Sequence, residues 1–150
     1  MWTQGKFPSH TMSHLAKCYY IKARDYMRAG EVSMDVQGLL KSVGFPAQLI
    51  RRVSICAYEA EMNVVMHGGD GRMLINIAPE RISIVVEDHG PGMEDIELAL
   101  KEGYSTATEE AREMGFGAGM GLPNIRKNSD SLEIFSEAGK GARLEIVFIQ

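Results

Sequence analysis

Glu59, Asn63 and His67 are spaced four residues apart in a segment whose pattern predicts one long helix. Residues at i, i+4 and i+8 lie on one helical face, so this face presents a carboxylate, an amide and an imidazole together. An amide oxygen suits a hard cation such as Mg²⁺, and a carboxylate can accept the proton of an attacking hydroxyl group. Taken alone, such a face is more often simply solvated. Glu61 lies about 200° from Glu59 around the helix and is expected to have no part in this chemistry.

A second cluster directly follows an apolar, strand-like run and reads Asp88-His89-Gly90-Pro91-Gly92-Met93. An acidic side chain at the end of a strand can accept a hydrogen bond from an exocyclic amine in a pocket. The glycines would let a flat ring approach the backbone closely. An ordinary turn explains the same glycines and proline, so this cluster alone leaves both interpretations open.

Alternating glycines form a third cluster, from Gly115 to Gly121, and Pro123 follows close to the start of a predicted helix. Free backbone N–H groups at a helix N-terminus can bind a phosphate group. The pattern is not of the Rossmann type, since no strand leads into the glycines, nor of the Walker A type, since no Gly-Lys-Ser/Thr follows. A flexible linker would look similar, and only the three clusters together indicate a nucleotide site.

The rest of the chain predicts the elements that would hold these clusters. Strand-forming residues predict strands at 18–23, 72–78, 81–87, 131–137 and 143–149. Apolar residues at helical spacing, with Gly and Pro as stops, predict helices at 30–43, 46–67, 94–101 and 122–128. This order predicts an α/β (α+β) two-layer sandwich, in which helices cover one face of a mixed, mostly antiparallel sheet.

Length and composition agree with one globular domain. The chain has 150 residues and 45% hydrophobic residues, which predicts a single domain at 17–150 after a poorly ordered leader at 1–16. A net charge of -4 argues against a general nucleic-acid binder. No apolar run approaches the roughly 18 residues of a membrane helix. Two cysteines without a CxxC pair predict neither a disulfide framework nor a zinc site, and favour a cytoplasmic location.

In this order, the three clusters resemble the motifs of the GHKL (Bergerat-fold) ATP-binding superfamily. Within it, the chain resembles the small anti-sigma-factor serine/threonine-protein kinases. The first cluster is similar to the N box, the second to the Asp-x-Gly-x-Gly box, and Gly119-Met120-Gly121-Leu122 to the second glycine box. The resemblance extends from about residue 18 to residue 148, and it implies a Bergerat fold that binds ATP with Mg²⁺.

The resemblance also implies a role for each matching position. Glu59 would be the catalytic base, Asn63 the magnesium ligand and Asp88 the partner of the adenine amine. Residues 104–118 would form a lid over ATP, in which Arg112 is a candidate for the terminal phosphate, with a solvated arginine as the alternative. The remaining nucleotide-binding residues would be His67, Gly90, Gly92, Met93, Ser105, Thr106, Gly115, Gly117, Gly119, Met120, Gly121 and Leu122.

One position departs from the family pattern. The final hairpin carries Gly141-Ala142 where the family usually has Gly-Thr, so one hydroxyl group that helps hold the adenine is missing. The loss of one neutral hydrogen bond costs about 0.5–1.5 kcal/mol. Nucleotide binding is therefore expected to be weaker but retained.

The implied function is a small regulator that transfers the γ-phosphate of ATP to a serine of an antagonist protein and binds a sigma factor. A homodimer is common in the family, although the sequence has no interface signature. Only one strand and one helix precede residue 46, which favours this class over histidine kinases. No direct contact with nucleic acid or membrane is expected. Two alternatives stay open: a module whose partner binding depends on nucleotide, and a slow ATPase.

Overall fold

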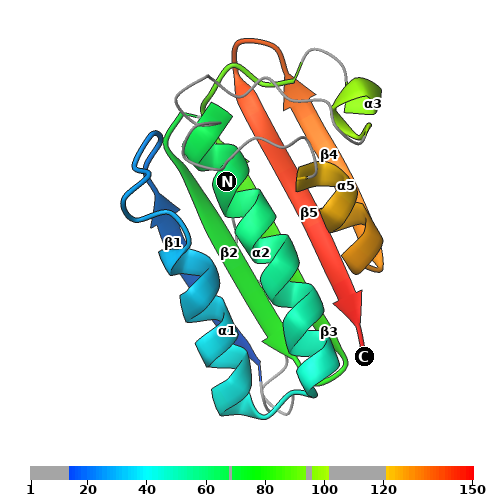
Figure 1. Ribbon diagram of the computed structural model, residues 1–150. Helices are drawn as coiled ribbons and strands as arrows, with labels where there is room; N and C mark the ends of the chain where they lie inside the picture. The colour runs from blue at the N-terminus through cyan, green and yellow to red at the C-terminus, as the bar shows by residue number, and fades with distance from the viewer. Residues whose placement is uncertain (1–13, 68, 94–95, 102–120) are drawn as a thin grey trace.

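The computed structural model describes residues 14–67, 69–93, 96–101 and 121–150. Five strands form one sheet in the order β1-β2-β3-β5-β4 (Figure 1). They are β1 (Leu15–Ile21), β2 (Gly71–Ala78), β3 (Arg81–Asp88), β4 (Ser131–Glu137) and β5 (Gly141–Ile149). Every strand pair among the described residues is antiparallel, so the parallel pairing that a mixed sheet would contain is not found there.

The helices are α1 (Glu31–Val43), α2 (Ala47–His67), α3 (Ile96–Ala99) and α5 (Gly121–Asn128). Figure 1 shows α1, α2 and α5 side by side on one face of the sheet, with α2 in the middle. This arrangement confirms the predicted two-layer sandwich. The ends of α1, α2 and α5 lie within one residue of the predicted ends, whereas α3 ends at Ala99, before the predicted end at residue 101.

One apolar layer fills the space between the helices and the sheet. Alternate residues of each strand face the helices, as the period of two in a strand requires. On the helical side, α2 contributes most of the buried residues, because it packs between α1 and α5. The fully buried side chains of this layer include Val36, Leu40, Val53, Ala57, Ala60, Met73, Ile75, Ile84, Ile125, Ile146 and Phe148.

The first strand, β1, begins at Leu15 and ends at Ile21, whereas the sequence predicts a strand at 18–23. Leu15 and Ala16, which the sequence assigns to the leader, pair with Ile77 and Asn76 of β2. The shift escaped prediction because β1 is an edge strand, in which only Tyr19 and Ile21 are buried. Residues 1–13 of the expected leader lie outside the described part of the chain.

Candidate functional site

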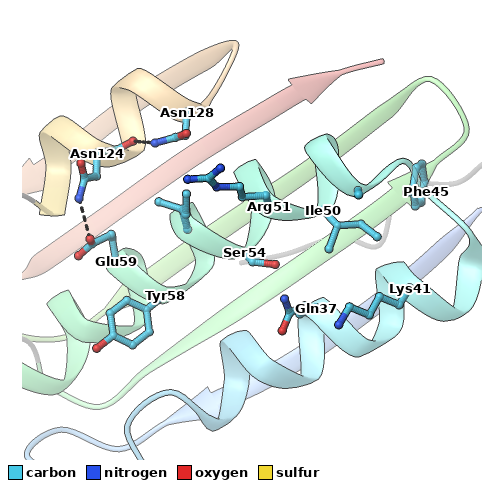
Figure 2. Close-up of a pocket in the computed structure, with 12 residues that line it drawn as sticks. Gln37, Lys41, Phe45, Ile50, Arg51, Ser54, Tyr58, Glu59, Asn124 and Asn128 are labelled. Carbon is cyan, nitrogen blue, oxygen red and sulfur yellow. Dashed lines mark hydrogen bonds between the residues drawn. The ribbon is translucent and has the colours of Figure 1, made fainter.

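The first and third clusters meet where α5 begins against α2. The Asn124 side-chain amide donates a hydrogen bond of 2.9 Å to Glu59 Oε2, as Figure 2 shows. A Cβ atom placed on Gly121 would lie 3.3 Å from Asn63 Oδ1 and 3.7 Å from Glu59 Oε1. Because Gly121 has no side chain, its backbone can lie directly beside these two oxygens. The fold therefore brings the Glu59–Asn63 face of α2 to the start of α5.

Contacts near the other end of α5 hold this helix against α2. Arg52 Nε donates to the Asn128 carbonyl oxygen at 3.0 Å, and the same guanidinium forms an ion pair of 3.1 Å with Asp130. The Cys56 thiol donates to the Ile125 carbonyl oxygen at 3.6 Å. Burial raises the pKa of this thiol to about 12, so it stays protonated and unreactive. These contacts fix the orientation of α5, and with it the position of Gly121.

Asp88 ends β3 in a half-buried position. The Gly90 N–H donates to Asp88 Oδ1 at 2.8 Å, which forms a tight turn after the strand. Burial raises the pKa of the Asp88 carboxyl group, and hydrogen bonds from the Gly90 and Ala142 N–H groups partly oppose this effect. A Cβ atom on Gly71 would lie 3.1 Å from both Asp88 Cβ and Val64 Cγ1. Asp88 therefore lies close to α2, next to the turn of helix that carries Asn63.

The segment after Asp88 is held by the β4–β5 hairpin. Gly92 has a φ of 76°, and a Cβ atom there would approach the Glu137 carbonyl oxygen to 2.6 Å, so this position requires glycine. The Met93 N–H donates to Ser136 Oγ at 2.6 Å. Sequence reasoning missed Ser136, because it looks like any polar residue of an alternating strand. Its role depends on a contact that only the fold reveals.

His67 is the last residue of α2, one turn beyond Asn63. Burial lowers the pKa of its imidazole, and the positive charge of Arg24 lowers it further, so the neutral form is favoured. Arg24 itself closes the end of α2: its N–H donates to the Val65 carbonyl oxygen at 2.9 Å, and its guanidinium donates to the Met66 carbonyl oxygen. The role of His67 in nucleotide binding stays a prediction.

Glu61 has a structural role that the sequence did not reveal. Its side chain is only 2% exposed, and its carboxylate accepts hydrogen bonds from the N–H groups of Gly30, Val32 and Ser33 at 3.0, 3.3 and 2.9 Å. These groups begin α1, whose first turn has no intrahelical partner for them. Glu61 points away from Glu59, as predicted, but toward α1 rather than toward solvent. The angle between Glu59 and Glu61 around the helix correctly predicted that the two side chains point apart. It could not show that α1 lies where Glu61 points.

The oxygen atoms beside Gly121 suit magnesium that arrives with a nucleotide. Among the residues that the structure describes, no group of three or more His, Cys, Asp or Glu side chains could hold a metal ion. Mg²⁺ commonly takes one or two protein oxygens and completes its shell with phosphate oxygens and water. Asn63 Oδ1, with the Glu59 carboxylate next to it, fits this donor set.

Several predicted nucleotide-binding positions lie outside the described residues. These are the lid at 104–118 and the residues Ser105, Thr106, Arg112, Gly115, Gly117, Gly119 and Met120. Among the positions that are described, Leu122 is buried in the core and Gly90 is buried close to the backbone of Gly69.

Comparison with known proteins identifies relatives of most of the chain. Residues 23–148, which include all three clusters, match the family described as the histidine kinase-like ATPase domain. The serine/threonine-protein kinase RsbT of Bacillus subtilis (strain 168) is 27% identical over 115 residues, which cover 74% of this chain and 80% of RsbT. The anti-sigma F factor of Clostridium perfringens (strain SM101 / Type A) is 35% identical over 121 residues, covering 77% of this chain and 83% of that protein. No helix in the described part of the chain is both long and apolar enough to cross a membrane.

Proposed function

Because this chain belongs to the histidine kinase-like ATPase domain family, we propose that it is an ATP-binding regulator of the anti-sigma-factor type that phosphorylates a partner protein on a serine. The names of its relatives, a serine/threonine-protein kinase and anti-sigma F factors, support this class. The observation that carries the proposal is the Glu59 carboxylate, held by Asn124 beside Asn63 and the start of α5. A base, a metal ligand and a phosphate-binding helix start are the parts that phosphoryl transfer requires.

Each residue has a separate task in this proposal. Asp88 accepts a hydrogen bond from the adenine amine, and Asn63 holds Mg²⁺. The magnesium ion neutralises charge on the phosphate groups as they react. Glu59 accepts the proton of the serine hydroxyl, and Asn124 keeps the carboxylate pointing toward that proton. Catalysis then rests on positioning and on charge neutralisation.

The placement of Glu59 favours phosphotransfer over a module that only binds a partner. A module that only binds a partner when nucleotide is present has no use for a carboxylate held in this place. A slow ATPase would use the same base with water, so a transfer assay with a protein acceptor is needed to separate it. We propose an antagonist protein and a sigma factor as the partners.

A cytoplasmic location and a homodimer belong to the same proposal. The cytoplasm supplies ATP and keeps Cys18 and Cys56 reduced, in agreement with their free state. Exposed apolar side chains on the β1–α1 side support self-association: Tyr20 is 83% exposed, Met27 90% and Met34 71%. Light scattering on the purified protein tests the dimer.

The proposal is tested with γ-labelled ATP, Mg²⁺ and candidate partner proteins. Glu59→Gln preserves the shape and polarity of the side chain, so nucleotide affinity should stay within a few fold. Phosphotransfer should fall by roughly 10²–10⁴, the range for loss of a general base. Asn63→Ala should weaken magnesium-dependent binding and turnover together. Glu133→Gln, an exposed change on β4, is the matched control and should have no effect.

Three results would contradict this assignment. If Glu59→Gln retained full transfer activity, another residue would have to be the base. If label appeared only as inorganic phosphate with every partner, the protein would be an ATPase. Nucleotide binding without any turnover would support the binding module instead.

A further inference from the structure

A groove of about 820 Å³ runs along the solvent-facing side of the helical layer and ends at Glu59 (Figure 2). Its lining residues come from α1, α2 and α5 and from the connection between α1 and α2. Phe45 lies at the end remote from Glu59. From Ala47 to Glu59, α2 rises roughly 18 Å, which is the length of about five or six residues of extended polypeptide. The groove is therefore long enough for a peptide segment.

The lining combines an apolar surface with two cations. Phe45, Ile50 and Tyr58 supply apolar contact area. Lys41 and Arg51 are exposed, and neither forms an ion pair with any residue that the structure describes. Glu59 is the one carboxylate among the described lining residues. This local positive charge stands out on a chain whose net charge is -4.

We propose that this groove docks an extended, acidic and partly apolar segment of the partner protein and delivers its serine hydroxyl to Glu59. The cations favour carboxylates on the segment, and charge complementarity of this kind sets both specificity and association rate. Phe45 and Tyr58 are placed to hold apolar side chains. Docking itself needs no nucleotide, whereas delivery of the hydroxyl rests on the proposed function.

The position of Glu59 at one end of the groove explains how a serine hydroxyl delivered there could be phosphorylated. Glu59 faces the groove, and its carboxylate also lies beside Gly121, where the phosphates are expected. In the transfer, the serine oxygen forms a bond to the γ-phosphorus, and the bond from that phosphorus to the β,γ-bridging oxygen breaks. ADP leaves, and the hydroxyl proton goes to the Glu59 carboxylate. The peptide thus reaches the base along the groove, at a carboxylate that also lies beside the start of α5.

Docking is tested on the full chain without nucleotide, using a phage-displayed library of random 12-residue peptides. We expect enrichment of peptides that contain Asp or Glu together with apolar residues. The best peptide, synthesised with a fluorescent label, is then measured by anisotropy. The double variant Lys41→Glu/Arg51→Glu should bind it roughly tenfold more weakly or worse, because two attractive charges become repulsive.

Lys22→Glu/Arg81→Glu is the matched control, since it makes the same change of charge at two exposed positions outside the groove lining. Circular dichroism checks that both double variants are folded. The docking proposal is overturned if no peptide is enriched, if enriched peptides are neutral or basic, or if both double variants bind equally well. MgATP binding and transfer to serine are measured separately. A peptide that docks in the groove but is never phosphorylated would contradict the proposed function and leave the docking site standing.

Discussion

Asp88 combines a half-buried carboxyl group with a proposed role, binding of the adenine amine, that favours the ionised form. Burial raises the pKa of this group, and the Gly90 and Ala142 N–H groups only partly oppose it. The ionised carboxylate is the stronger acceptor for a hydrogen bond from the adenine amine, because protonation removes its charge and adds a competing donor. Adenine affinity should therefore decline as pH falls through the raised pKa, at a higher pH than for an ordinary aspartate. Calorimetric titration of ADP between neutral and mildly acidic pH measures this decline.

Asp88→Asn is the matched variant for that titration. At neutral pH, this variant should bind ADP much more weakly than the wild-type protein does. Its remaining affinity should no longer decline as pH falls, because the titrating carboxyl group is gone. An ADP affinity at neutral pH equal to that of the wild-type protein would remove Asp88 from the adenine pocket.

The same substitution should leave the fold intact. A pKa that is raised in the folded state means that the protonated carboxyl group favours folding at low pH and that this contribution is lost as pH rises. Asparagine stays neutral at every pH and keeps an oxygen that can accept the Gly90 N–H bond. We therefore expect the free energy of unfolding of nucleotide-free Asp88→Asn at pH 7 to equal or exceed that of the wild-type protein. Urea denaturation checks this, and a large loss of stability would show that Asp88 is mainly structural.

Asn124 is expected to act through Glu59 as a positioning residue. Asn124→Ala removes the 2.9 Å hydrogen bond to the carboxylate but leaves the base in place. Phosphotransfer should fall roughly tenfold, equivalent to about 1.4 kcal/mol, which is close to the worth of one hydrogen bond to a charged group. The KM for MgATP should change little. Arg126→Ala is the control, because Arg126 is exposed on the same helix and lies outside the groove lining. Equal losses in both variants would indicate a general disturbance of α5.

At the scale of the elements, α1 depends on a side chain from α2. The Glu61 carboxylate accepts three N–H bonds at the start of α1, where no side chain of α1 itself forms a capping hydrogen bond. Glu61→Ala would leave these buried donors without an acceptor, at roughly 1–3 kcal/mol for each unsatisfied group before any relaxation. We expect a loss of about 3 kcal/mol in the free energy of unfolding, measured by urea denaturation.

Glu31→Ala provides the comparison for this loss. Glu31 is exposed in the first turn of the same helix, where a negative charge contributes about 0.3–1 kcal/mol through the helix dipole. If both variants lost the same small amount of stability, Glu61 would not be the cap that its contacts indicate.

The helices and strands in which apolar residues recur at regular spacing could be predicted from sequence, whereas the contacts between them could not. The apolar stripe of α2 and the two hairpins of strand-forming residues predicted the two-layer sandwich. The three clusters identified Glu59, Asn63 and Asp88 as candidate site residues. The roles of Glu61, Asn124 and Ser136 each depend on a neighbour from a distant part of the chain. A polar residue in a helix or edge strand looks the same in sequence whether it faces water or a buried donor.

At the scale of the whole molecule, the site joins two halves of the chain. Glu59, Asn63 and Asp88 come from α2 and β3, while Gly121 and the hairpin contacts come from α5, β4 and β5. The sheet order places β5 directly beside β3, so the two halves share a continuous core as well as the site. A nucleotide bound across them should therefore stabilise the entire fold rather than one element.

The size of this stabilisation follows from mass action and gives the last prediction. ATP with Mg²⁺ at 100 times its Kd should raise the free energy of unfolding by about 2.7 kcal/mol. For a domain of 150 residues, this corresponds to a rise in Tm of roughly 5–10 °C. At the same concentration, a variant with a hundredfold weaker affinity should gain only about 0.4 kcal/mol, so Asp88→Asn should show almost no shift. GTP, which lacks the adenine amine that Asp88 is proposed to bind, should also give little shift in the wild-type protein. Thermal unfolding followed by circular dichroism measures all three cases, and an equal shift with ATP and GTP would contradict the adenine pocket at Asp88.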